Sequence, residues 1–285
     1  MRNRFALALA ILMAAQPLAA QEVQEQVDTA FEAVATAVAE AGLDPVVSID
    51  HARLADKEGV AMPASRVQIF SDAGLDSAIL AAEIRAGLDL PLRVLAYDRE
   101  GALAVMATDS AFLMARHGLV PSDALSGWDD RLDAVLIPVA DRASMAPVSG
   151  LTKDYGIIEL PSAYGLAESI QRLKDAILSQ GDTVWFGEQD FRARAEAHGV
   201  SLPSATLLLF GGPAPGGVAM AEFPSIGLDA FCQKLFLYER EDGTVIALFN
   251  GISALAELHY GKASEAHQAL DTRLTQTFTE ALARK

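Results

Sequence analysis

The chain has 285 residues, with 22 basic and 38 acidic side chains, and its formal net charge at pH 7 is −16. Such an acidic surface repels phosphate backbones, which excludes nucleic acid as a natural partner. The chain contains one cysteine, Cys232, so it gains no internal disulfide and must be stabilised by its core. The length predicts two domains of ordinary size.

The first twenty residues have the layout of a secretory signal peptide. Arg2 and Arg4 form a basic start, "FALALAILMAA" is an apolar run, and "QPLAAQE" supplies small residues before a polar turn. The apolar run is shorter than the ~20 residues that span a bilayer. We predict cleavage after Ala20, a periplasmic or secreted chain of charge −18, and no stable membrane span in the mature protein.

Next in chain order comes an amphipathic helix that ends at Gly42, with an apolar stripe of Val27, Phe31, Val34 and Val38. A short strand ("VVSI"), a short helix ending at Gly59 and a strand ("RVQIF") follow. A hairpin is then predicted, with the arms "LPLRVLAYD" and "ALAVMAT" around "REG". A short helix and a longer one complete the unit.

The second half of the chain repeats this series. A helix that ends at Gly181 carries a stripe of Leu166, Ile170, Leu173 and Ile177. It precedes "TVWF", a short helix ending at Gly199, "ATLLLF" and a hairpin of "KLFLYE" and "TVIALF". An extra strand, "YGIIEL", begins this half. We interpret "GGPAPGG" as a flexible turn and Cys232 as a buried, inert thiol.

Ordered matches show that the chain is a duplication. "GVAMP" at 59–63 corresponds to "GVSLP" at 199–203, and "GLD" at 87–89 corresponds to "GLD" at 227–229. Tyr97 then matches Tyr238, and His117 matches His259. Such a long period indicates duplicated domains rather than a solenoid. We predict a signal peptide over 1–20, a first domain over 21–145, a linker over 146–154 and a second domain over 155–285.

Both copies resemble the domain-of-unknown-function family 302. The resemblance rests on "IDHARLADKEGVAMP" and "GLDLPLRVLAYDREG" in the first copy, and on "GVSLP", "LLLFGGP" and "LYEREDG" in the second. It implies an α+β fold of two tandem two-layer domains related by a pseudo-twofold axis. Each would have a curved antiparallel sheet backed by helices, similar in shape to TATA-binding-protein-like folds. The resemblance implies no established activity. The second copy departs from it with Phe191 in place of the family histidine and "LDAF" in place of "LDLP".

His51 is the main candidate for function. It follows a predicted strand, lies beside Asp50 and is replaced by Phe191 in the second copy, so the fold does not require it. A histidine oriented by a carboxylate is suited to acid–base chemistry or ligand binding. Alternatively, Asp50 only caps a helix and His51 satisfies a nearby carbonyl. His117 and His259 are interpreted as helix-terminal histidines. The predicted ligand-binding residues are Asp50, His51, Phe70, Asp89 and Tyr97.

Three function classes remain open. The first is an exported, non-catalytic module that binds a small ligand or an envelope protein. It is favoured because GxSxG, HExxH, CxxC and GxxxxGK[ST] are all absent. The alternative is an enzyme with a His51/Asp50 acid–base pair. A third is metal or haem handling by His51 with Met62 and Met106. Histidine spacing gives it no support, so no metal site and no cofactor are predicted.

Overall fold

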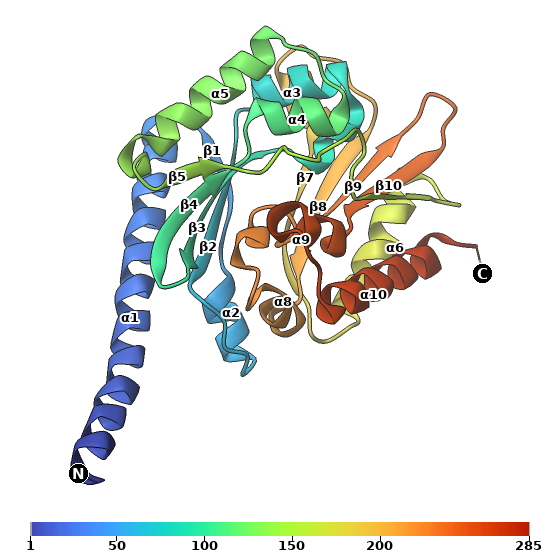
Figure 1. Ribbon diagram of the computed structural model, residues 1–285. Coiled ribbons are helices and arrows are strands. Elements are labelled where there is room, and N and C mark those ends of the chain that lie inside the picture. Colours follow the sequence, from blue (N-terminus) through green and yellow to red (C-terminus); the bar gives the residue numbers. More distant parts are fainter. Residues whose placement is uncertain (1, 285) are drawn as a thin grey trace.

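The protein consists of two α+β units, each a five-stranded sheet backed by helices (Figure 1). The computed structural model describes the backbone of residues 2–284 and the side chains of residues 20–284. The first unit comprises α1 (Arg2–Glu40), β1 (Asp44–Asp50), α2 (His51–Lys57), β2 (Ser65–Ser71), α3 (Ala73–Ala82), η1 (Ile84–Leu88), β3 (Leu92–Arg99), β4 (Ala102–Ala107), α4 (Ser110–His117), α5 (Asp123–Leu136), η2 (Ile137–Val139) and β5 (Ala143–Met145).

The second unit repeats this series from its first helix to its last. It comprises β6 (Ile157–Pro161), α6 (Leu166–Leu178), β7 (Val184–Asp190), α7 (Phe191–Ala197), β8 (Ala205–Gly211), α8 (Pro213–Met220), η3 (Pro224–Gly227), β9 (Gln233–Glu239), β10 (Val245–Asn250), α9 (Ile252–Tyr260) and α10 (Glu265–Leu282). The predicted α+β class in two repeated units is confirmed.

The two sheets differ only in the strand at one edge. Their strand orders are β1-β2-β3-β4-β5 and β6-β10-β9-β8-β7. The place beside β4 is taken by β5, which is parallel and comes from the end of its unit. The place beside β10 is taken by β6, which is antiparallel and begins its unit. The extra strand predicted for the second copy is therefore β6, and β5 fills the corresponding edge in the first.

The predicted helical stripes form the contacts between helix and sheet. α1 lies against β2, β3 and β4 (Figure 1), and Val27, Val34 and Val38 are buried there. In the second unit Leu173 and Ile177 of α6 join a core with residues of α10. Burial of one apolar face stabilises such helices more than intrinsic propensity does.

The residue pairs predicted from the duplication occupy equivalent places. Gly59 and Gly199 follow α2 and α7 with φ of +76° and +71°, a conformation that glycine adopts without steric cost. Tyr97 and Tyr238 lie in β3 and β9, and His117 and His259 lie in the last turns of α4 and α9. The boundaries predicted for the two domains and their linker stay predictions.

The interpretation of "GGPAPGG" as a flexible turn is wrong, because α8 begins there at Pro213. Proline fits the first turn of a helix, where its missing N–H is not needed. The glycines are tolerated because α8 packs closely on α2: a Cβ atom at Gly217 would lie 2.6 Å from Cβ of Ala55. Tertiary contact thus outweighs the low helix propensity of glycine.

Buried charges join the two repeats, and each repeat contributes an aspartate and a histidine. Asp89 Oδ2 accepts a hydrogen bond from Arg116 Nη1 at 2.8 Å and lies 2.7 Å from His117 Nε2. In the second repeat Asp229 Oδ2 lies 2.9 Å from His259 Nε2. Both histidines are at helix ends, as expected, but each imidazole contacts a carboxylate of its own repeat.

Other bonds of this cluster cross from one repeat to the other. Arg93 of β3 donates to Asp229 Oδ1 at 2.6 Å and to the carbonyl oxygen of Leu228 at 3.0 Å. Arg116 donates to Asn250 Oδ1 at 2.8 Å. Burial would raise the pKa of Asp89, but Arg116 and the neighbouring cations outweigh it and hold this pKa well below its usual range.

No helix among the described residues is both long and apolar enough to cross a membrane. The predicted signal peptide falls on residues whose side chains, apart from that of Ala20, lie outside the described part. The buried side chains described for α1 begin at Val23.

We predict that Asp89→Asn lowers the free energy of unfolding by about 3–5 kcal/mol, because it leaves buried cations without their counter-charge. Urea denaturation at pH 7 measures this loss. The control Asp133→Asn changes an exposed carboxylate of α5 and should stay within about 0.5 kcal/mol of the wild type. Equal losses in the two variants would show that the cluster does not hold the repeats together.

Candidate functional site

His51 begins α2 at the contact between the repeats. Asp50 ends β1 and caps the helix, its Oδ1 accepting a hydrogen bond from the backbone N–H of Arg53 at 2.8 Å. The cap fixes the first turn, and His51 is 7% exposed. Asp50 also pairs with the Arg53 side chain. Among the described residues no hydrogen bond joins Asp50 to the imidazole, so the acid–base pair of the enzyme alternative is not assembled.

The side chain of His51 lines a small cavity whose other walls come mainly from the second repeat. The cavity volume is about 20 Å³, which holds one water molecule or one monatomic ion. Its surroundings are largely apolar. The lining residues are His51, Leu54, Phe186, Gly211, Gly212, Pro213, Gly216, Met220, Phe231 and Cys232.

The duplication explains why there is space here. With the offset of 140 residues, Gly211 corresponds to Ser71 and Gly216 corresponds to Asp76. At the equivalent contact, between α3 and α7, Ser71 Oγ donates to Asp76 Oδ2 at 2.5 Å. Two side chains that meet in one contact are thus replaced by glycines in the other.

Phe191 completes the filling of the equivalent contact. Its ring packs edge-on against Phe236, with ring centroids 6.0 Å apart. Arg194 of the same helix donates to Ser71 Oγ at 3.0 Å. Its counterpart in the first repeat is Leu54, which lacks a donor. One contact is therefore packed with aromatic and ion-pairing side chains, and the other retains a cavity beside a histidine.

His51 is held in its neutral form. Burial lowers the pKa of its imidazole to about 4, although the charge of Asp50 and the backbone of Gly227 oppose this shift. Within the described part of the chain, Nε2 of His51 has no hydrogen-bond partner. A buried polar atom is normally satisfied, and one that is not calls for a ligand, an ion or a water molecule.

The cavity also contains two sulfur-bearing side chains, Met220 and Cys232. Cys232 immediately precedes β9 and is 3% exposed. Burial raises the pKa of its thiol to about 12, although Lys234 and Arg93 favour the thiolate. The residues that line the cavity thus include a histidine, a cysteine and a methionine among largely apolar neighbours.

The other residues predicted for the ligand site lie elsewhere. Asp89 belongs to the charge cluster between the repeats. Phe70 lies buried in β2, and Tyr97 lies buried in β3, where burial raises the pKa of its hydroxyl. Of the five predicted residues, only His51 lines the cavity.

Sequence analysis missed Met220 and the glycines of the cavity, and it interpreted Cys232 as a buried, inert thiol, of which the burial is confirmed. A signal was present: aligning the copies places Gly211 opposite Ser71 and Gly216 opposite Asp76, which marks a loss of side-chain volume on one side only. The signal becomes informative only when α2 is known to pack on α8 of the other repeat.

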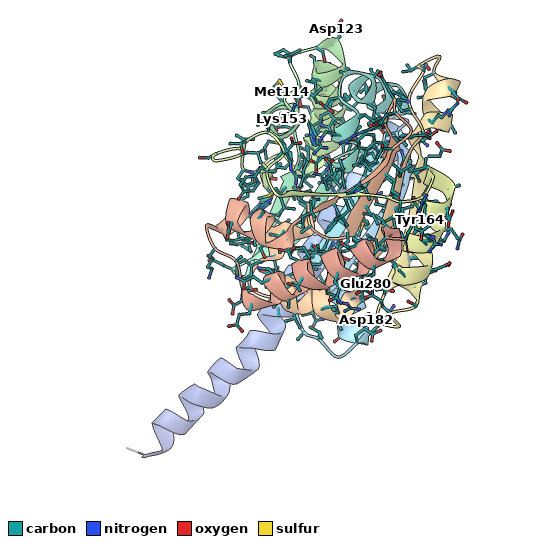
Figure 2. The ribbon with its side chains drawn as sticks, turned by 90° about the vertical axis from the view of Figure 1, so that its right-hand side faces the viewer. Met114, Asp123, Lys153, Tyr164, Asp182 and Glu280 are labelled. Atoms are coloured by element: carbon teal, nitrogen blue, oxygen red, sulfur yellow. The ribbon has the colours of Figure 1, made fainter. Side chains whose placement is uncertain are left out.

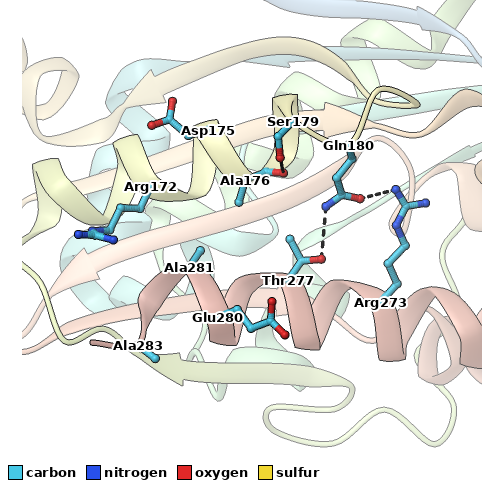
Figure 3. A pocket seen from close by; sticks show the side chains of 10 residues that line it. All are labelled: Arg172, Asp175, Ala176, Ser179, Gln180, Arg273, Thr277, Glu280, Ala281 and Ala283. Atoms are coloured by element: carbon cyan, nitrogen blue, oxygen red, sulfur yellow. Dashed lines mark hydrogen bonds between the residues drawn. The ribbon is translucent and has the colours of Figure 1, made fainter. Parts of the chain in front are cut away.

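A larger hollow lies between α6 and α10 (Figure 3), with a volume of about 880 Å³. Figure 2 shows Tyr164, Asp182 and Glu280 on this face. Its arginines are already bound: Arg172 pairs with Glu168, and Arg273 pairs with Asp182 and bonds to Gln180. It is an open surface groove. The smaller cavity is the better candidate site, because it is lined by a histidine with an unpartnered buried nitrogen.

The chain belongs to the protein family described as "Domain of unknown function DUF302". The family profile matches residues 19–138 and again residues 158–280, one match in each repeat. A crystal structure of an uncharacterized conserved protein DUF302 from Bacillus stearothermophilus aligns with a TM-score of 0.38 at 16% identity. The alignment covers 45% of this chain and 95% of that one.

Curated relatives match part of the chain. Proteins named Fluoride-specific ion channel FluC 1 from Brucella suis biovar 1 (strain 1330) and Brucella abortus biovar 1 (strain 9-941) are each 34% identical over 106 residues. The match covers 37% of this chain, and 41% and 38% of the two relatives. The chain thus spans about two fifths of the length of these relatives.

The filled contact leads to a prediction about pH. Burial raises the pKa of Asp76 to about 7 from 3.8, although Ser71 and Arg194 oppose this, while Asp72 and Asp44 add to it. Because the folded state holds the proton more tightly, its stabilisation is complete below pH 3.8 and is lost as the pH rises to about 7.

Asp76→Asn removes this titration and retains an acceptor for Ser71. We expect the wild type to lose stability relative to the variant between about pH 4 and pH 7, and no further above that. Urea denaturation of both proteins across this range measures the difference. Parallel stability curves would show that Asp76 is ionised in the folded protein throughout.

Proposed function

We propose that the protein is a non-catalytic binding module that holds an atom-sized ligand in the cavity between its repeats. One observation carries this proposal: His51 lines a cavity with room for one ion or water, and its buried Nε2 has no partner among the described residues. The equivalent contact holds the side chains of Phe191, Asp76 and Arg194 instead. The comparison of the two contacts thus indicates that the space beside α2 is specific to this contact and is not a general defect in how the repeats pack.

The cavity volume of about 20 Å³ limits the ligand to the size of a water molecule or a single ion. α2 and α8 approach too closely at Gly217 for a methyl group to be added without displacement. A Cβ atom at Gly216 would lie 3.3 Å from the ring of Phe231, so the lining is already near contact. An organic ligand would require the repeats to separate, and the buried charge cluster opposes that separation.

His51→Phe tests the proposal. The variant should lose the bound ligand because phenylalanine fills the space without offering a ring nitrogen. Its melting temperature in the ligand-free state should remain within about 2 °C of the wild type, because Phe191 shows that the fold accepts phenylalanine at this position.

Native mass spectrometry of both proteins measures the ligand, first as isolated and then after incubation with halide, divalent-metal and monovalent-metal salts. Wild type should carry one adduct that acid denaturation removes, and the variant should carry none. Identical spectra from the two proteins would contradict a ligand site at His51.

We also propose that the protein is exported to the periplasm or beyond, with removal of residues 1–20. The signal-peptide layout of these residues supports this. The packing of α1 is compatible with it, because Ala20, Gln21 and Glu22 are exposed and Val23 is the next, buried residue. Cleavage after Ala20 would leave those contacts intact.

Intact-mass measurement of protein from the envelope fraction tests export. The expected chain begins at Gln21. A full-length chain beginning at Met1 in that fraction, or recovery of the protein only from the cytoplasm, would contradict the proposal.

A further inference from the structure

We propose that the ligand of the cavity is a soft monovalent metal ion, Cu(I) or its analogue Ag(I), bound by His51 Nε2, Cys232 Sγ and Met220 Sδ. This inference rests on the proposed function and names the chemical class of its ligand. The three side chains come from α2, from α8 and from the residue before β9, and all line the same cavity.

The donor set selects the ion. Thiolate and thioether sulfur favour Cu(I), and imidazole also suits copper. Divalent zinc takes four ligands in structural sites, and hard cations take carboxylate and carbonyl oxygens. The described residues contain no group of three or more histidine, cysteine, aspartate or glutamate side chains that could hold a metal. A two- or three-coordinate ion that accepts methionine as a ligand fits these constraints.

Size and polarity favour the same ion. The cavity of about 20 Å³ excludes an ion that retains its water shell. Leu54, Phe186 and Phe231 provide apolar walls, which offer no compensation for a second positive charge. A monovalent ion bound to one thiolate is neutral overall, so its burial here is not opposed by an uncompensated charge.

Charge balance gives the binding step. The thiol of Cys232 loses its proton to solvent as its sulfur bonds to the ion, which enters and remains in the monovalent state. His51 is already neutral and offers a nitrogen lone pair without releasing a proton. Metals bind the deprotonated form of such ligands, so binding releases protons. Each bound ion should therefore release one proton.

Burial disfavours the thiolate of Cys232, whereas Lys234 and Arg93 of the charge cluster favour it. Lys234 is 3% exposed, and among the described residues its Nζ has no hydrogen-bond partner. Within the described part of the chain its ion contact is to Asp89 Oδ1, at 3.6 Å. The cluster contains three cations, Arg93, Arg116 and Lys234, against the two carboxylates Asp89 and Asp229. A thiolate at Cys232 would be stabilised by this excess positive charge.

Anaerobic titration of the full chain with Cu(I), in competition with a chromophoric Cu(I) chelator, tests the assignment. Wild type should bind one equivalent, release one proton and show a thiolate-to-metal absorption band. Cys232→Ser and His51→Phe should each weaken binding by at least about 100-fold, since losing a direct ligand costs at least as much as losing an outer one. Met220→Leu should weaken it by about tenfold.

The matched control is Met106→Leu, which changes a methionine of β4 outside the cavity and should leave the affinity unchanged. Circular dichroism of each variant establishes folding. If Cys232→Ser does not fold, the losses in His51→Phe and Met220→Leu, with the absorption band of the wild type, still decide the assignment. Zn²⁺ serves as the comparison ion. Titration with Zn²⁺ should show no binding that depends on His51, Cys232 or Met220.

The two proposals fail differently. If the wild type carries an adduct of another mass that His51→Phe lacks, and binds neither Cu(I) nor Ag(I), the metal assignment is overturned and the binding function stands. If neither ion binds and the two proteins also give identical spectra, both proposals are overturned. Cu(I) binding that survives Cys232→Ser and Met220→Leu would place the ion elsewhere.

Discussion

The charge cluster between the repeats determines the relative placement of everything else. Arg93 of the first repeat binds Asp229 of the second, and Arg116 binds both Asp89 and Asn250. Removing one partner from a buried ion pair is strongly destabilising, so these contacts resist separation of the repeats. The two sheets are therefore docked in one arrangement, and that docking brings α2 against α8 and α7 against α3. The cavity at His51 exists only because this contact is fixed.

A duplicated chain makes the same contact between repeats twice. Each residue that differs between the two contacts therefore shows which side chains the fold itself does not require. Ser71, Asp76 and Phe191 fill one contact, whereas Gly211, Gly216 and His51 occupy the corresponding positions of the other. Packing alone would favour filling both, since unfilled volume costs stability. The fold demonstrably accommodates the filled arrangement. The retained space beside an unsatisfied imidazole therefore argues for occupancy by a ligand.

The repeats, the helical stripes and the hairpins could be predicted from the sequence because they depend on local periodicity and on glycines such as Gly59 and Gly199. His51 could be singled out because Phe191 replaces it. Its surroundings could not, since Met220 and Cys232 lie far away in sequence and reach it only through the docking of repeats. The prediction for "GGPAPGG" is wrong for the same reason. The intrinsic propensity of its glycines and prolines favours a turn, whereas packing against α2 of the other repeat stabilises a helix.

The charge cluster and the cavity are connected through the start of β9. Cys232 lines the cavity, and Lys234, two residues further on, enters the cluster near Asp89. Burial lowers the pKa of Lys234 to about 8, with Arg93 acting in the same direction and the two aspartates opposing it. Because the cavity has walls from both repeats and Lys234 of the second repeat contacts Asp89 of the first, separating the repeats would open the cavity and break this ion contact together.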